Sequence, residues 1–168
     1  ANSTDARRVI DDAAAAAQAW GERSASDRAQ VLFKFRELCL AHRDEIARLI
    51  SSEHGKVLAD ARGEVTRGLE VVEFACGIPH LLKGEFSENV GSGVDSWSLR
   101  QPVGVCAGIT PFNFPAMVPL WMFPVAIACG NTFVLKPSEQ VPMTQQMVFG
   151  IIDELGLPEG VVNLVNGS

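Results

Sequence analysis

Asn113 is a candidate for chemistry because aromatic residues and prolines surround it. It lies in the turn Thr110-Pro111-Phe112-Asn113-Phe114-Pro115, directly after an apolar segment. The prolines restrict the backbone, and we expect the neighbouring side chains to exclude water. A side-chain amide held in this way can donate a hydrogen bond to an oxygen that becomes negative in a reaction. The alternative is a turn asparagine that bonds its own backbone, and the spacing alone leaves both open.

Lys136 and Glu139 form a second candidate pair, in a turn that follows another apolar segment. An ammonium group and a carboxylate can together hold the hydroxyls of a ribose, and nucleotide-binding folds place an acidic residue near a strand end for this purpose. The alternative is a solvated ion pair at the start of a helix with Ser138 as its N-cap. If both apolar segments are parallel strands, the two polar turns lie where an α/β sheet binds its ligand.

Arg67 is the third candidate, because it heads an apolar stripe on a predicted helix. Val71, Phe74 and Ile78 follow it at helical spacing. A guanidinium in such surroundings requires a carboxylate partner. That partner is either an aspartate or glutamate of the chain or the carboxylate of a substrate.

The elements that must position these residues alternate along the second half of the chain. The pattern predicts strands at residues 103–109, 132–135 and 161–165, with helices at 116–128 and 143–155 between them. Apolar strands that alternate with helices indicate a parallel sheet with right-handed crossovers, covered on both faces. The predicted fold class is therefore α/β, with N-terminal helices followed by a parallel Rossmann-like sheet. The motif G-x-G-x-x-G is missing after the first strand, which disfavours an ordinary Rossmann or P-loop phosphate site.

The chain divides into three predicted parts. Residues 1–83 form the N-terminal helical part, in which Ser26 is the expected N-cap of one helix. Residues 84–101 carry glycines and a period-two alternation, which predicts an exposed antiparallel strand or hairpin arm. The arm can present Trp97 to another subunit, or it can be an edge strand packed on its own domain. Residues 102–168 form the first βαβαβ part of a nucleotide-binding domain.

Composition excludes several classes of function. The chain has 168 residues, 47% hydrophobic and 20% charged, which is typical of one globular domain or its core. A net charge of −6 without a Lys/Arg cluster argues against a nucleic-acid partner. The cysteines match no metal site, so we expect free thiols in a reducing compartment, the cytoplasm or alternatively the mitochondrial matrix. No apolar run is long enough to span a membrane, and no membrane partner is expected.

Three segments resemble the aldehyde dehydrogenase superfamily: GVCAGITPFNFP at residues 104–115, GNTFVLKPSE at 130–139 and GVVNLVNG at 160–167. The resemblance continues through the N-terminal helices and covers essentially all 168 residues. Phe112 stands where many non-acylating relatives carry tryptophan. Together with SLRQP at residues 98–102, it makes the chain most similar to the CoA-acylating branch of methylmalonate-semialdehyde dehydrogenases.

The resemblance implies roles at the reacting end of the site. Asn113 would be the oxyanion-hole amide that stabilises the oxyanion of a thiohemiacetal. Arg67 would bind the carboxylate of malonate or methylmalonate semialdehyde, for which a buried and unpaired guanidinium is suited. A cysteine thiolate would attack the aldehyde, NAD would accept the hydride, and carbon dioxide would leave before the acyl group passes to CoA.

The resemblance also implies the cofactor contacts. Thr110 and Phe112 would contact the nicotinamide side of NAD. Lys136 and Glu139 would hold the adenosine ribose, with Gln140 beside them. NAD is thus the implied cofactor, CoA is the implied co-substrate, and no metal is expected.

The chain departs from the family pattern in what it lacks. The nucleophilic cysteine and the general-base glutamate of the family lie downstream of residue 168, so the catalytic domain is absent from this sequence. We expect an N-terminal fragment that binds NAD weakly and does not turn over substrate. The complete enzyme would act on small-molecule aldehydes as a homodimer or homotetramer joined through the arm. The alternatives are a non-acylating aldehyde dehydrogenase that releases a free acid, and a truncated, non-catalytic nucleotide-binding or assembly module.

Overall fold

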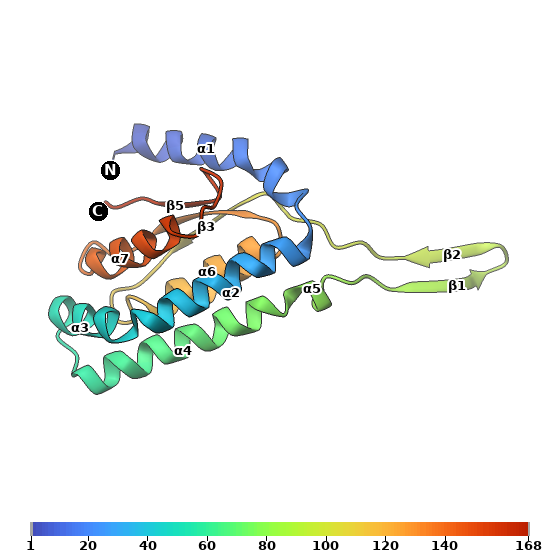
Figure 1. Ribbon diagram of the computed structural model, residues 1–168. Coiled ribbons are helices and arrows are strands. Elements are labelled where there is room, and N and C mark those ends of the chain that lie inside the picture. The colour runs from blue at the N-terminus through green and yellow to red at the C-terminus, as the bar shows by residue number, and fades with distance from the viewer. Residues whose placement is uncertain (1, 168) are drawn as a thin grey trace.

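The chain forms layers of helices against a small parallel sheet, and a hairpin projects from one end (Figure 1). A computed structural model describes residues 2–167. Helices come first along the chain and parallel strands follow, which confirms the predicted fold class. The N-terminal helices are α1 (Ser3–Gly21), α2 (Ala25–Ala41), α3 (Arg43–His54), α4 (Leu58–Cys76) and α5 (Ile78–Leu81).

Polar side chains set where the first two helices begin. α1 starts with a capping box, in which Asn2 accepts from the backbone N–H of Asp5 and the Asp5 side chain accepts from the N–H of Asn2. α2 starts after Ser24, whose hydroxyl accepts from the N–H of Asp27 at 3.1 Å. The predicted cap at Ser26 is therefore wrong, because Ser26 already lies inside the first helical turn.

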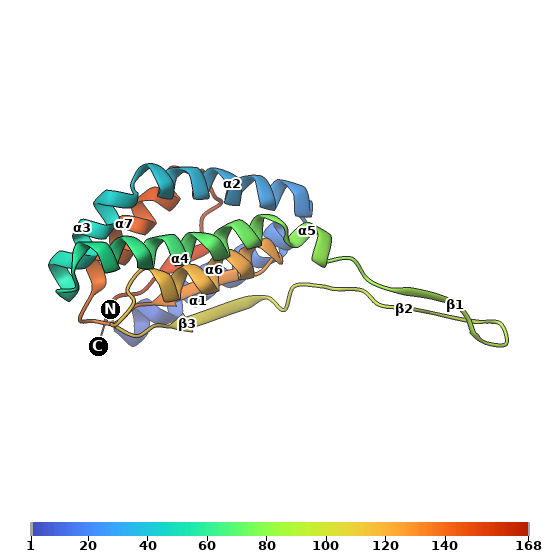
Figure 2. The same cartoon turned by 90° about the horizontal axis from the view of Figure 1, so that it is seen from below.

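The parallel sheet lies between helices. Its strands stand in the order β3 (Val105–Ile109), β4 (Thr132–Lys136) and β5 (Val162–Leu164). The crossover helices α6 (Met117–Ala128) and α7 (Pro142–Asp153) join them. α1 covers one face of the sheet, and α6 and α7 cover the other (Figures 1 and 2). This arrangement buries a continuous apolar layer on each side of β4.

β3 and β4 end side by side, because Ile109 pairs with Lys136 in the parallel register. Both predicted polar turns therefore leave the sheet at the same edge. β4 is buried from Thr132 to Leu135, as expected for a strand covered on both faces. The same expectation is wrong for β3, where the exposed fraction of Ile109 is 79%. Within residues 2–167 no strand pairs with the outer edge of β3.

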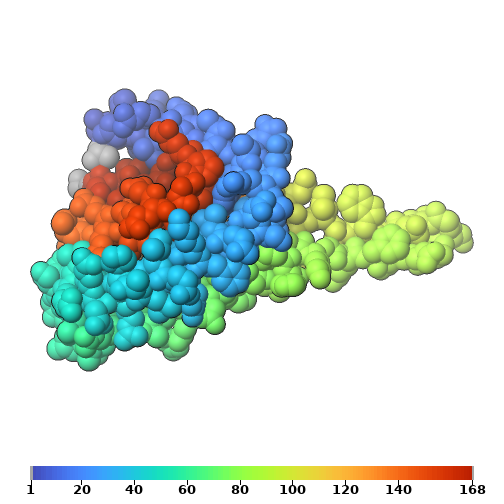
Figure 3. Space-filling model, in the orientation of Figure 1, coloured from blue at the N-terminus to red at the C-terminus, as the bar shows by residue number. Residues whose placement is uncertain are grey.

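The segment after α5 forms a long, exposed hairpin arm. β1 (Phe86–Gly91) and β2 (Val94–Trp97) pair in antiparallel fashion and extend away from the helices (Figures 1 and 3). All residues of both strands are exposed, and the exposed fractions of Trp97 and Leu99 are 69% and 66%. The alternative of an edge strand packed on its own domain is therefore wrong. Pairing of the arm with another subunit stays a prediction.

Two glycines offer a matched test of how the segment before β5 packs. Gly160 has a φ of 86°, and a Cβ there would lie 2.5 Å from the carbonyl oxygen of Asp12 in α1. Gly156 has a φ of 67°, but a Cβ there would meet no described atom within 4 Å. Gly156→Ala should lower the free energy of unfolding by about 1–2 kcal/mol through backbone strain alone. Gly160→Ala should lower it by a further ~1–3 kcal/mol through overpacking. Denaturant titration measures both, and equal losses would contradict the close packing against α1.

Candidate functional site

The turns that follow β3 and β4 lie next to each other at the carboxyl edge of the sheet. The backbone N–H of Thr110 donates to the carbonyl of Lys136 at 3.1 Å, which extends the strand pairing by one residue. Lys136 Nζ donates to Glu139 Oε2 at 3.2 Å, and Gln140 follows directly. Four of the five predicted cofactor residues therefore gather at the ends of two adjacent parallel strands. Such a strand edge is where α/β sheets bind ligands.

Lys136 and Glu139 offer a donor and an acceptor that remain partly open to solvent. The exposed fractions of their side chains are 28% and 55%. A hydrogen bond from its own backbone N–H, followed by the Lys136 ammonium, holds the pKa of Glu139 below its usual value. Glu139 is therefore an anionic acceptor at neutral pH. A ribose clamp and a solvated ion pair both fit this geometry.

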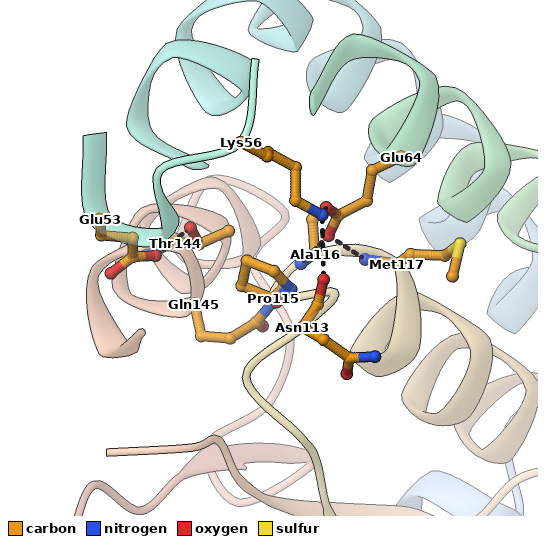
Figure 4. Close-up of polar contacts among 9 residues, drawn as sticks. All are labelled: Glu53, Lys56, Glu64, Asn113, Pro115, Ala116, Met117, Thr144 and Gln145. Carbon is orange, nitrogen blue, oxygen red and sulfur yellow. Dashed lines mark hydrogen bonds and ion pairs between the residues drawn. The ribbon is translucent and has the colours of Figure 1, made fainter. Parts of the chain in front are cut away.

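The predicted N-cap role of Ser138 is wrong. α7 begins at Pro142, after the turn, and its first N–H groups are satisfied from a distant helix. Glu53 of α3 accepts hydrogen bonds from the backbone N–H groups of Met143 and Thr144, each at 2.8 Å. Figure 4 shows Glu53 beside Thr144. This carboxylate is also favourably placed toward the positive end of the helix dipole. Ser138 instead accepts from the N–H of Gln140 at 3.3 Å, within the turn.

A hollow of about 930 Å³ lies between α4 and the turn that joins β3 to α6. Asn113 lines it from the turn and Arg67 from α4, so the predicted catalytic and substrate-binding residues share one cavity. Phe114 and Trp121 add aromatic walls. The cofactor residues at the ends of β3 and β4 are not among its lining residues. The candidate site thus has two adjoining parts, a cavity and a sheet edge.

α4 comes close to the turn because it packs tightly along α6. At the point of contact α4 carries Gly68, where a Cβ would lie 2.6 Å from Cδ1 of Leu120. Val65 and Leu69 are buried on the same side of the helix. A larger residue than glycine would push the two helices apart, and the cavity wall would move with α4.

The side-chain amide of Asn113 is available to a ligand. Within residues 2–167 it makes no hydrogen bond, and Figure 4 shows it directed away from Lys56. The interpretation as a turn asparagine bonded to its own backbone is therefore wrong. The expected exclusion of water is also not found, because Asn113 is exposed and Phe112 and Phe114 have exposed fractions of 48% and 37%. The Phe112 ring stacks on His54, with centroids 6.0 Å apart.

Lys56 and Glu64 form a buried ion pair behind the turn, and the sequence analysis missed both. The exposed fractions of their side chains are 11% and 1%, and Lys56 Nζ lies 2.5 Å from Glu64 Oε2. Glu64 Oε1 accepts from the backbone N–H groups of Ala116 and Met117, at 2.8 and 3.2 Å. The same carboxylate therefore caps α6 and neutralises a lysine (Figure 4).

Lys56 joins this pair to the candidate catalytic residue. Its Nζ donates to the backbone carbonyl of Asn113 at 2.9 Å and lies 4.4 Å from the centre of the Phe114 ring. One signal in the sequence could have drawn attention to Glu64. It falls among the buried positions Ala61, Val65 and Gly68 of α4, where a carboxylate requires donors.

Arg67 lines the cavity, but its exposure and its pairing differ from those predicted. Its side chain is 70% exposed, and its guanidinium pairs with Glu70, three residues further along α4, at 2.9 Å. The expectation of a buried and unpaired guanidinium is therefore wrong, and an internal glutamate is the partner. Exposed ion pairs of this kind contribute only about 0–1 kcal/mol to the free energy of unfolding. A competing carboxylate in the cavity could therefore displace Glu70.

The cysteines are free, and burial keeps most of them protonated. Burial raises the pKa of Cys39 to about 12 and also raises the pKa values of Cys76 and Cys129. These thiols are poor nucleophiles at neutral pH. The described part of the chain holds no group of three or more His, Cys, Asp or Glu residues suited to a metal ion. Between residues 2 and 167, every helix is too short or too polar to cross a membrane.

Comparison with known proteins identifies the family of this fold and site. The model of the aldehyde dehydrogenase family matches residues 1–168. The chain therefore belongs to the aldehyde dehydrogenase family. Among curated relatives, a malonate-semialdehyde dehydrogenase of Pseudomonas aeruginosa is 56% identical over 162 residues, which are 96% of this chain and 33% of that protein. The acylating, mitochondrial methylmalonate-semialdehyde dehydrogenase of Arabidopsis thaliana is 52% identical over 89% of this chain and 24% of its own length.

Solved structures agree with this assignment. A methylmalonate-semialdehyde dehydrogenase from Oceanimonas doudoroffii superposes with a TM-score of 0.97 and 56% identity, over 100% of this chain and 34% of that chain. A Sinorhizobium meliloti protein described as a methylmalonate-semialdehyde dehydrogenase and complexed with NAD gives a TM-score of 0.96 and 49% identity, over the same shares. The chain thus spans about a third of the length of the relatives it matches.

Proposed function

We propose that this chain is part of an NAD-dependent aldehyde dehydrogenase that converts methylmalonate or malonate semialdehyde to propionyl-CoA or acetyl-CoA with loss of carbon dioxide. The observation that carries the proposal is that Asn113 and Arg67 line one cavity. An amide donor suits an aldehyde oxygen, and a guanidinium suits a carboxylate on the same small molecule. Two relatives that are more than 50% identical bear the names malonate-semialdehyde dehydrogenase and methylmalonate-semialdehyde dehydrogenase. Partner subunits would join through the exposed arm formed by β1 and β2.

Asn113 would act on the aldehyde oxygen. As a nucleophile adds to the carbonyl carbon, that oxygen gains negative charge, and a preorganised amide N–H stabilises it. The amide is free of other hydrogen bonds within the described residues, so no bond has to be broken before it donates. None of the four free cysteines is among the residues that line the cavity, so the proposed nucleophile is a residue outside this chain.

NAD would accept the hydride, and the residues at the sheet edge fit its ribose and nicotinamide portions. The cationic and anionic side chains of Lys136 and Glu139 stand together at the carboxyl end of β4, where they can donate to and accept from ribose hydroxyls. Gln140 would lie beside them. Thr110 and Phe112 would contact the nicotinamide side, since they follow the adjacent strand β3. The pyrophosphate would require donors beyond this chain, because the glycine-rich motif is absent.

Arg67 would bind the substrate carboxylate in exchange for Glu70. The two partners compete for one guanidinium, so binding of the substrate would open the pair seen in the structure. This exchange supports a semialdehyde that carries a carboxylate over a simple aliphatic aldehyde. The aromatic side chains of Phe114 and Trp121 would enclose the short carbon chain.

Product analysis tests the proposed reaction. The complete protein, supplied with malonate semialdehyde and NAD, should form NADH, carbon dioxide and acetyl-CoA only when CoA is present as the acyl acceptor. Mass spectrometry of the products distinguishes the outcomes. Release of a free acid with no thioester would contradict the acylating reaction and support a non-acylating aldehyde dehydrogenase.

Removal of the amide tests the role of Asn113. Asn113→Ala in the complete enzyme should lower kcat by about 10²–10³-fold, because one oxyanion donor contributes about 3 kcal/mol to the transition state. Gln146→Ala, which removes an exposed amide on α7, is the control and should leave kcat unchanged. Unchanged turnover of Asn113→Ala, with chemistry shown to be rate-limiting, would exclude Asn113 from the mechanism.

Arg67→Leu tests the substrate class. A charged hydrogen bond contributes about 1.5–3 kcal/mol, so kcat/KM for malonate semialdehyde should fall roughly 10- to 100-fold. The value for propanal, which lacks a carboxylate, should change little. Arg62→Leu is the matched control, because Arg62 also lies on α4 but pairs with Asp44 away from the cavity. Equal losses on both aldehydes would contradict the assignment of Arg67.

A further inference from the structure

The turn that carries Asn113 is anchored at several backbone atoms. Its carbonyl at Asn113 accepts from Lys56, and its carbonyl at Pro115 accepts from Gln145 Nε2 at 2.6 Å. The next two N–H groups, at Ala116 and Met117, are bound by Glu64. Asn113 lines the cavity, and within the described residues its side-chain amide has no hydrogen-bond partner and points away from Lys56 (Figure 4).

The Lys56 contact constrains the direction of that amide. The carbonyl and the side chain of Asn113 leave from neighbouring backbone atoms, so a fixed peptide plane limits where the side chain can point. Pro111 and Pro115 restrict the backbone on either side but leave the peptide after Asn113 free to rotate. The lysine ammonium holds this peptide through its carbonyl oxygen, and Lys56 itself lines the same cavity as Asn113.

Helix capping alone does not account for the pair. Glu64 already caps α6 through Ala116 and Met117, and a neutral amide in its place would retain an acceptor oxygen. Adding a buried lysine brings a second charge out of water, and such pairs are often no more stabilising than apolar residues of similar volume. The contact that the lysine adds is the one with the turn of Asn113.

We infer that the buried Lys56–Glu64 pair is a positioning device that aims the Asn113 amide at the substrate oxygen. Lys56 and Glu64 also line the cavity, but their charges pair with each other, and in this account they act through Asn113. The inference rests on the proposed function, because it requires Asn113 to stabilise an oxyanion. It predicts that loss of the pair lowers kcat and leaves the KM for the aldehyde nearly unchanged.

A double-mutant cycle in the complete enzyme tests this inference. The first change is the combined variant Lys56→Met/Glu64→Gln, which removes both charges but keeps an acceptor for the N–H groups at the start of α6. The second change is Asn113→Ala. With Asn113 present, the combined variant should lower kcat on the order of 10–100-fold, as expected for a misplaced catalytic group. In the Asn113→Ala background, the same change should lower kcat by less than about 3-fold, because the group that it positions is gone.

A matched ion pair provides the control. Arg62→Met/Asp44→Asn removes opposite charges that link α3 to α4, but this pair is exposed and does not contact the turn. It should leave kcat unchanged in both backgrounds. If the combined variant does not fold, as judged by thermal unfolding, Lys56→Met alone replaces it in the cycle, because Glu64 then keeps its two backbone donors, and it should show the same non-additivity.

The outcomes separate this inference from the proposed function. Equal fold-losses of kcat with and without Asn113, or a rise in KM with unchanged kcat, would overturn the positioning role and leave the proposed reaction standing. An Asn113→Ala enzyme with unchanged kcat would overturn the positioning role and the oxyanion role together. A wild-type protein that oxidises no aldehyde would contradict the proposed function itself, and the positioning role with it.

Discussion

A carboxylate taken out of water must find hydrogen-bond donors, and the position of Glu64 organises this part of the molecule around that requirement. Its side chain is 1% exposed, and it receives two backbone N–H groups and a lysine ammonium. Those donors come from the start of α6 and from the loop before α4, and Glu64 itself belongs to α4. These three segments are therefore held together at one carboxylate, next to the turn of Asn113. Removing one partner of such a buried pair typically costs about 3–5 kcal/mol.

The sheet supplies the second constraint. β3 and β4 end at paired residues, Ile109 and Lys136, so their following turns leave from one edge. The turn after β3 crosses toward α4 and forms the cavity, while the turn after β4 stays at the edge with Lys136 and Glu139. A ligand that extends from the cavity to the edge would meet Asn113 at one end and the Lys136–Glu139 pair at the other. This layout supports the proposal of an aldehyde bound beside a dinucleotide.

Local sequence patterns allowed the helices, the parallel strands and the shared edge of the two polar turns to be predicted. A helix through Arg67 was predicted from apolar residues at helical spacing, and α4 is that helix. The common edge for Asn113 and Lys136 follows from the ends of parallel strands. The pairing of Arg67 with Glu70 was readable from their spacing, yet the exposure of Arg67 was not, because it depends on which neighbours cover that face of α4. The family resemblance was confirmed by whole-chain matches.

Long-range contacts account for what could not be predicted. Glu53 caps α7 from a helix 90 residues earlier, so the nearer Ser138 was the wrong choice. Lys56 reaches the carbonyl of Asn113 across 57 residues, and no local pattern marks that partner. A glutamate on an apolar face signals that donors exist, but the tertiary fold decides which donors they are.

Amide hydrogen exchange at Ala116 and Met117 in the complete protein tests most directly whether the buried pair fixes the turn. These N–H groups are held by Glu64 at the start of a helix, where exposed amides ordinarily exchange fast. The account predicts slow exchange in the wild-type protein and clearly faster exchange when Lys56 and Glu64 are replaced by Met and Leu, a change that removes the acceptor together with both charges. Fast exchange in the wild-type protein, or equal rates in both, would contradict it.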